Sequence, residues 1–167
     1  MKDLAGPDVV VATLDKDGKP CFVKAGEPAR FIVPEIVDVA YVWESKGIAD
    51  VPRGIGAPPP DISFPAAGGT KFGLVCFAPK SADKFDEAQR TATDADYDED
   101  GMHMSDTIDY DVVISGKIDV KLEGGEIRTL RQGSMIIMAG VNHTWKNPYD
   151  EPCVMATIIV GAHSKRG

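Results

Sequence analysis

The stretch GSMIIMAGVNHTWKN, residues 133–147, is the most informative part of this chain. A turn glycine opens a short apolar run, Met135–Met138, and a second glycine-containing turn leads directly into a polar and aromatic cluster. Apolar strands that end in convergent histidine and asparagine side chains are how small β-barrels furnish a pocket. The stretch therefore predicts a barrel strand with site residues at its end, namely Asn142, His143, Trp145 and Asn147.

A second stretch, HMSDTIDYDVVISGKIDVKL at 103–122, is the natural counterpart of the first. Its polar residues His103, Ser105, Thr107 and Asp109 recur at every second position. Successive side chains of a strand point to opposite faces, so on an unbroken strand these four share one face. The spacing predicts a second strand that lines the same pocket.

Together the two stretches resemble the two sequence motifs of the cupin superfamily. The first motif reads roughly G-x5-H-x-H-x3-E-x6-G, and its two His, Glu and last Gly positions here hold His103, Ser105, Asp109 and Gly116. The chain departs from the pattern in two ways, because a serine replaces the second histidine and an aspartate replaces the glutamate.

The second cupin motif reads roughly G-x5-P-x-G-x2-H-x3-N, and the chain matches it at Gly133, Gly140, His143 and Asn147, with Met138 at the Pro position. The forms that the two motifs take in this chain are similar to the motifs of small single-domain cupins. The resemblance implies an all-β double-stranded β-helix, or jelly-roll barrel, with extra N-terminal strands. It also implies a homodimer.

Length and composition predict one domain over residues 1–167, with strands and a loop in 1–80 and the barrel's motif region in 98–162. No apolar run reaches membrane-spanning length, and the first residues lack a signal-peptide core. The three cysteines fit reduced thiols. We therefore expect a cytoplasmic protein. Its net charge of −8 argues against nucleic acid and anionic membranes as partners, and we expect a small-molecule substrate.

Strand patterns dominate the chain, and one short segment, Ala82–Ala92, fits a helix. The Pro- and Gly-rich segment Val51–Thr70 predicts a long irregular loop, either a lid over the barrel mouth or a surface loop packed on a dimer partner. Glu123–Glu126 predicts a hairpin turn. The expected strands lie within Phe31–Trp43, Lys71–Phe77, Asp111–Leu122, Glu126–Leu130, Met135–Met138 and Val154–Val160.

The cupin resemblance implies a candidate metal site. His103, Asp109 and His143 stand where the family places three of its four ligands. Two imidazoles and one carboxylate suit one divalent metal, which would be Fe, Mn, Ni or Zn. The opposing hypothesis is a metal-free cupin, in which these side chains only hydrogen-bond the substrate or one another.

Acid–base chemistry needs no metal. A histidine titrates near neutral pH, so His143 and His103 are candidate catalytic acid and base, with Asp109 orienting one imidazole. Around them we expect a substrate-binding lining in which Trp145 stacks on a planar ligand. The remaining candidate substrate-binding residues are Asn142, Ser105, Thr107, Tyr110 and Met138.

Three functions follow as hypotheses. The favoured one is a lyase or isomerase, of dehydratase or decarboxylase type, acting on an oxygenated aromatic or polyketide-like substrate. The second is a metal-dependent dioxygenase that uses His103, Asp109 and His143. The third is a ligand-binding cupin without turnover. An acidic run, Asp96–Gly101, opens like a calcium loop, but Thr107 stands where that loop needs a glutamate, so calcium is rejected.

Overall fold

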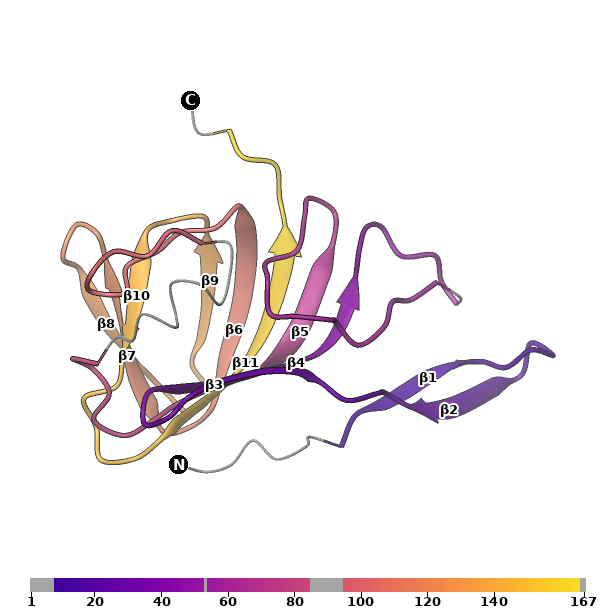
Figure 1. Ribbon diagram of the computed structural model, residues 1–167, viewed down its shortest axis with the longest axis horizontal. Helices are drawn as coiled ribbons and strands as arrows, with labels where there is room; N and C mark the ends of the chain where they lie inside the picture. The colour runs from indigo at the N-terminus through magenta and orange to yellow at the C-terminus, as the bar shows by residue number, and fades with distance from the viewer. Residues whose placement is uncertain (1–7, 53, 85–94, 166–167) are drawn as a thin grey trace.

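The computed structural model describes residues 8–52, 54–84 and 95–165, and every regular element within them is a β-strand (Figure 1). All paired strands run antiparallel. The all-β class expected from the sequence is confirmed. The strands are β1 (Val10–Leu14), β2 (Pro20–Lys24), β3 (Ala29–Val33), β4 (Val37–Ser45), β5 (Thr70–Phe77), β6 (Thr107–Ser115), β7 (Lys117–Leu122), β8 (Ile127–Arg131), β9 (Met135–Ala139), β10 (His143–Lys146) and β11 (Cys153–Gly161).

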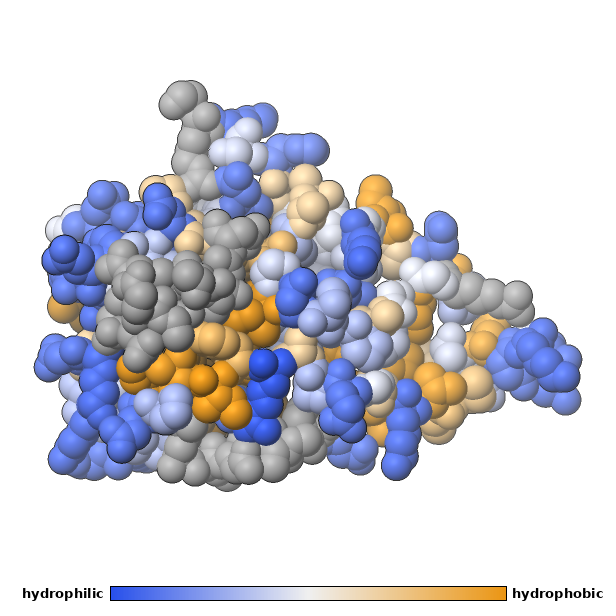
Figure 2. All heavy atoms as spheres, in the orientation of Figure 1, coloured by the Kyte–Doolittle hydropathy of each residue, from blue (hydrophilic) through white to orange (hydrophobic). Residues whose placement is uncertain are grey.

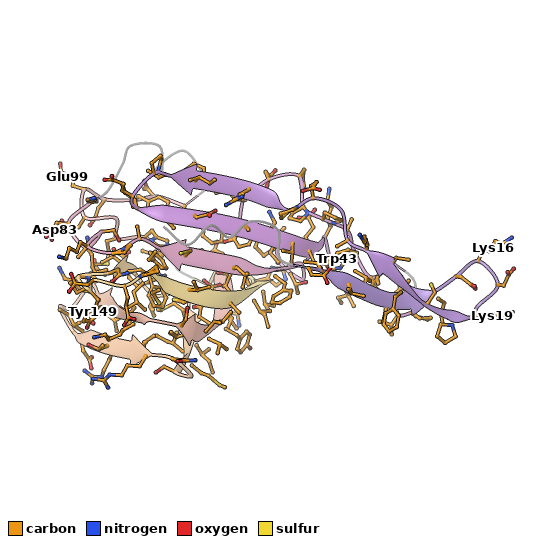
Figure 3. The ribbon with its side chains drawn as sticks, turned by 90° about the horizontal axis from the view of Figure 1, so that it is seen from below. Lys16, Lys19, Trp43, Asp83, Glu99 and Tyr149 are labelled. Atoms are coloured by element: carbon orange, nitrogen blue, oxygen red, sulfur yellow. The ribbon has the colours of Figure 1, made fainter. Side chains whose placement is uncertain are left out.

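A six-stranded sheet and a three-stranded sheet form the barrel (Figure 1). Their strand orders are β3-β4-β5-β11-β6-β9 and β10-β7-β8. Strands β1 and β2 form a separate hairpin that projects from the barrel. Figure 3 shows Lys16 and Lys19 at the tip of this hairpin, at the opposite end of the molecule from Asp83 and Tyr149.

Alternation along the strands separates core from surface. In β7, Ile118 and Val120 are almost completely buried, whereas Lys117 and Asp119 on the opposite face are partly exposed. Ile118 packs with Val113, Cys153 and Met155 from β6 and β11, so this cluster joins the two sheets. A second buried cluster forms at the other end of the barrel from Tyr41, Ile62 and Ile159.

Most expected strands are present, but two expected strands, Phe31–Trp43 and Asp111–Leu122, are each divided by a turn. Phe31–Trp43 is not one strand: Pro34 and the left-handed Glu35 (φ 61°) turn the chain, and β3 and β4 pair as a hairpin. The cupin-motif glycine, Gly116, makes the turn between β6 and β7 at φ 78°, where an added Cβ would lie 2.2 Å from the Pro152 carbonyl oxygen. Only glycine fits this turn.

The Pro- and Gly-rich loop is irregular, as expected, and it packs against the barrel and lines part of the cavity. Its Ile62 and Phe64 pack on Tyr41 and Ile159. Lys71 of β5, whose side chain is only 2% exposed, donates hydrogen bonds from Nζ to the carbonyl and carboxylate oxygens of Asp61 at 3.0 and 3.2 Å. The loop is therefore fastened to the sheet.

The predicted helix Ala82–Ala92 falls largely outside the described residues, and its first three residues form no helix. No described segment makes a helix with the length and apolarity needed to span a bilayer. The three cysteines are free thiols, and Cys76 and Cys153 are buried.

Candidate functional site

A cavity of about 150 Å³ lies between the two sheets. Figure 2 shows hydrophobic residues gathered near the middle of the barrel, whereas the hairpin tip is hydrophilic. Much of the cavity wall is aromatic or aliphatic, supplied by β3, β4, β5, β11 and the loop at 51–70. The polar residues that line it include His103, Asp109, Asp111, His143 and Thr157. This combination is typical of a small-molecule site.

His103 and His143 meet at one side of the cavity. The ring centroids lie 4.5 Å apart. Their backbones exchange two hydrogen bonds, His103 N to His143 O and His143 N to His103 O, each 2.9 Å long. The ring centroids of Tyr97 and His103 also lie 4.5 Å apart, and Trp145 contacts His143 edge-on with 6.0 Å between centroids. Each imidazole therefore packs against a second aromatic ring.

Each imidazole is fixed in one tautomer by a backbone carbonyl. Nδ1 of His143 lies 2.8 Å from the Val141 carbonyl oxygen, and Nδ1 of His103 lies 3.2 Å from that of Gly101. A carbonyl oxygen only accepts, so Nδ1 carries the hydrogen in both rings. In the neutral rings Nε2 then holds a lone pair, which is the form that a general base or a metal ligand requires.

Burial keeps both histidines neutral. Burial, together with the neighbouring His143, lowers the pKa of His103 to about 4, against smaller opposing effects of the Gly101 carbonyl and Asp98. Burial also lowers the pKa of His143, against the Val141 carbonyl. At neutral pH these residues are therefore proton acceptors. The expectation that one of them serves as the acid does not fit this environment.

Two carboxyl groups line the cavity from β6. Asp109 and Asp111 are two residues apart and share the inner face of the strand. Burial raises the pKa of Asp109, against a hydrogen bond from Thr107. Burial and the charge of Asp109 raise the pKa of Asp111 to about 6, against a hydrogen bond from Thr157 on β11. Asp111 is thus a buried carboxyl group that keeps its proton up to about pH 6.

Asp109 does not orient an imidazole. Its Oδ1 accepts a 2.6 Å hydrogen bond from the Thr107 hydroxyl, which lies 2.6 Å from the Ser105 hydroxyl. The Gly101 and Val141 carbonyls take the orienting role that the sequence analysis assigned to Asp109. Ser105 and Thr107 form a hydrogen-bonded chain leading to Asp109 and do not line the cavity themselves.

Strand interruption explains why the candidate residues are not all on one strand face. His103 makes only an isolated bridge with His143, the chain bends at Asp106, and β6 begins at Thr107. The prediction of one unbroken strand from His103 to Asp109 was wrong. Within the described residues no three His, Cys, Asp or Glu side chains are arranged to hold a metal ion. The three-ligand set of His103, Asp109 and His143 is therefore not assembled here.

The other predicted binding residues are distributed unevenly. Trp145 lines the cavity beside His143. Tyr110 points away from the cavity, on the outer face of β6, and is 43% exposed, so its predicted contact with substrate is wrong. Met138 is buried opposite Asp109, and Asn142 is half-buried, but neither lines the cavity.

Asp111 and Tyr41 are among the polar cavity residues that sequence reasoning missed. Asp111 continues the period-two pattern of Asp109, so the sequence could have predicted that it faces the cavity. The acidic position of the first cupin motif, however, is Asp109, two residues earlier. Tyr41 of β4 lines the cavity from the N-terminal half. Burial, together with Tyr97, Asp109 and Asp111, raises its pKa well above the ordinary value, so it stays a neutral hydroxyl. No local signal marks Tyr41.

Comparison with known proteins agrees with the fold. No protein-family profile matches the chain. AerE from Microcystis aeruginosa shares the fold with a TM-score of 0.51 at 16% identity, over 84% of this chain and 48% of that one. The class of protein that this architecture defines is the cupin-type jelly-roll barrel.

Two kinds of curated relative match a short part of the chain. Phomopsin biosynthesis cluster protein C' of Diaporthe leptostromiformis is 46% identical over 46 residues, which are 28% of this chain and 24% of that protein. A cupin-domain-containing oxidoreductase of Neurospora crassa, srdD, is 35% identical over 49 residues, 29% of this chain and 25% of that protein. The matched segment spans about a quarter of the length of each relative. Fold and relatives together support the cupin superfamily.

Proposed function

We propose that this chain is a cupin enzyme of the lyase type, a dehydratase or a decarboxylase, that moves protons without a metal. The observation that carries the proposal is the tethering of both imidazoles through Nδ1, which leaves the Nε2 lone pairs of His103 and His143 as bases. A base needs an acid partner, and Asp111 is a buried carboxyl that holds its proton to about pH 6.

In a dehydration, an imidazole Nε2 removes the proton from carbon and the Asp111 carboxyl gives its proton to the leaving hydroxyl. The products are water and a carbon–carbon double bond, and both groups exchange protons with solvent before the next turnover. His143 is the stronger candidate for the base, because Trp145 fixes its ring from the side.

The lining of the cavity supports an oxygenated aromatic or polyketide-like substrate. Aromatic walls such as Phe31, Phe77 and Trp145 suit a planar ring, and a cavity near 150 Å³ suits a molecule of single-ring size. The carboxyl groups of Asp109 and Asp111 can accept hydrogen bonds from hydroxyl groups of the substrate. Relatives from biosynthesis clusters are consistent with such a substrate.

The matched oxidoreductases favour a second candidate, the metal-dependent dioxygenase that would use His103, Asp109 and His143. One experiment separates the two. Chelator-treated protein is incubated under nitrogen with hydroxybenzoates, β-hydroxy ketones and β-keto acids, and products are followed by NMR. His143→Ala is the test variant, and Tyr110→Phe on the outer face is its matched control.

Metal-free, anaerobic turnover that His143→Ala abolishes and Tyr110→Phe retains supports the lyase. Turnover that appears only with added iron and oxygen overturns it in favour of the dioxygenase. Saturable binding by the same compounds with no product under either condition overturns both and leaves a ligand-binding cupin.

A further inference from the structure

Tyr41 of β4 is a buried phenol whose hydroxyl makes no hydrogen bond within the part of the chain that the structure describes. The residue lines the cavity and is only 6% exposed. Among the described residues no fully enclosed polar side-chain atom lacks a partner, so this hydroxyl opens into the cavity. A buried hydroxyl without a partner costs free energy, and a polar atom of a bound ligand would remove that cost.

The register of the six-stranded sheet fixes the position of Tyr41. Directly opposed residues of β4, β5, β11 and β6, which lie side by side (Figure 1), form one inner row: Tyr41, Gly73, Thr157 and Asp111. Gly73 has no side chain, and an added Cβ there would lie 2.6 Å from Cδ1 of Tyr41. The tyrosine ring therefore occupies the space beside Gly73 in this row.

The Tyr41 ring is held in place from several directions. It packs with Ile62 of the loop and with Ile159 of β11. The Lys71 ammonium group lies 5.8 Å from the ring centroid. Burial and acidic neighbours raise the pKa of the phenol, so the hydroxyl keeps its proton and can donate it to a hydrogen bond. Tyr41 is therefore a positioned donor on the cavity wall.

Asp111 is the second polar group at the cavity end of this row. Three strand spacings of about 4.8 Å, or about 14 Å, separate its Cα from that of Tyr41. Its carboxyl group accepts a hydrogen bond from Thr157, and within the described residues none joins it to the phenol. The wall thus presents two separate polar groups, and a ligand that carries two oxygens can contact both.

His143 faces this row from the other sheet. It belongs to β10 of the three-stranded sheet and lines the same cavity. Burial lowers its pKa, so its imidazole is a weak base. A weak base removes a proton from carbon only where a neighbouring carbonyl group takes up the electron pair. A hydrogen-bond donor aimed at that carbonyl oxygen stabilises the charge that develops there.

We infer that the Tyr41 hydroxyl binds a ketone oxygen of the substrate, and that the substrate is a β-hydroxy ketone whose hydroxyl group lies beside Asp111. The inference rests on the proposed lyase function. His143 Nε2 takes the proton from the carbon between the two oxygen-bearing carbons, and the electron pair moves onto the ketone oxygen as an enolate held by Tyr41. The ketone then re-forms, a carbon–carbon double bond appears, the bond to the hydroxyl group breaks, and the proton of Asp111 completes a water molecule.

Ligand binding tests the role of Tyr41 without any turnover. The probes are acetophenone, a single-ring ketone, and ethylbenzene, which has the same ring and no oxygen. In the full chain, Tyr41→Phe is expected to weaken acetophenone binding about fivefold and to change ethylbenzene binding by less than about twofold, since only the ketone loses a hydrogen bond. The infrared carbonyl stretch of bound acetophenone should rise in this variant. Tyr110→Phe, the same change on the outer face of β6, is the matched control and should behave as wild type.

Three outcomes overturn the inference. Equal loss of both compounds in Tyr41→Phe would mean that the ring only packs in the wall. A carbonyl stretch that changes in Asp111→Asn but not in Tyr41→Phe would make Asp111 the donor. Wild-type protein that binds neither compound at millimolar concentration would show that the cavity does not accept a single-ring ketone. Retained ethylbenzene binding shows that the cavity of Tyr41→Phe is intact.

The two proposals fail separately. A ketone that is hydrogen-bonded by Tyr41, in a protein that does not dehydrate β-hydroxy ketones, keeps the binding role of Tyr41 and rejects the lyase. Dehydration by Tyr41→Phe at the wild-type rate keeps the lyase and rejects the role of Tyr41.

Discussion

His103 and His143 exchange both of their backbone hydrogen bonds, at 2.9 Å each, although they stand on segments separated by four strands. This bridge brings the two motif stretches together and sets their rings 4.5 Å apart. Because each ring is also tied through Nδ1, the pair presents two basic nitrogens in fixed positions. The proposed acid–base chemistry rests on this relationship.

Replacing His143 tests the base. We expect His143→Ala to lower kcat by about 10²–10⁴-fold, the usual contribution of a positioned general base, with a much smaller change in affinity. His143→Gln should fail as well, since an amide cannot accept and release a proton at neutral pH. Steady-state kinetics on an active compound give both values. Near-wild-type turnover by His143→Gln would show that His143 only binds the substrate and that His103 is the base.

The pH profile of kcat/KM should be bell-shaped, with its alkaline limb near pH 6. The acidic limb reflects protonation of His143, whose pKa burial holds below its ordinary value, and the alkaline limb reflects ionisation of Asp111, whose pKa is about 6. Asp111→Asn should remove the alkaline limb and most of the activity. A profile that rises through pH 7 and stays flat above it would exclude a protonated Asp111 as the acid.

Asp111 should also destabilise the fold at neutral pH. Its pKa is raised in the folded state, so the folded protein binds its proton more tightly, and this contribution is lost as the pH rises from about 4 through 6. Asp111→Asn should therefore increase the free energy of unfolding at pH 7 by up to about 3 kcal/mol, and by little near pH 4. Urea unfolding at both pH values measures this. Asp17→Asn, at the exposed hairpin turn, is the control. An equal gain at both pH values would mean that the effect is not electrostatic.

The hydrogen bonds from Lys71 to Asp61 should hold the loop at 51–70 against the barrel. We expect Lys71→Met to raise hydrogen exchange over residues 58–66 by about tenfold, since a hydrogen bond to a charged group contributes roughly that factor. Ligand affinity should fall too, because Ile62 and Phe64 line the cavity. Lys80→Met, which removes an exposed pair with Asp150, should leave exchange in the loop unchanged. Unaltered protection in Lys71→Met would show that apolar packing alone holds the loop.

Metal analysis tests the remaining ligand prediction. The described residues do not bring His103, Asp109 and His143 into one coordination shell, so we expect purified protein refilled with Fe, Mn, Ni or Zn to retain less than one tightly bound ion. Its melting temperature should then change little when a chelator is added. Stoichiometric metal that raises the melting temperature, and that Asp109→Ala loses, would contradict this and restore the dioxygenase hypothesis.

The sequence by itself determined the fold class and the two stretches that meet. Alternation of Ile118 and Val120 with Lys117 and Asp119 is a local property of a strand, and glycine at 116 is required by a turn in which no Cβ fits. These signals act within a few residues, so they can be read before folding is considered. The resemblance to the two cupin motifs predicted that His103 and His143 meet inside one barrel, and their ring centroids lie 4.5 Å apart.

Only the tertiary structure decided what the site residues do. The chain bends at Asp106, so His103 lies outside β6 and bridges to His143, and no local sequence pattern near Asp106 predicts this bend. Burial between two sheets lowers the pKa of His103 and raises that of Asp111. Proton affinity depends on the dielectric surroundings and on neighbours from distant strands such as Tyr41. Asp109, which the sequence predicted as a metal ligand, is therefore one of two buried carboxyl groups on the inner face of β6.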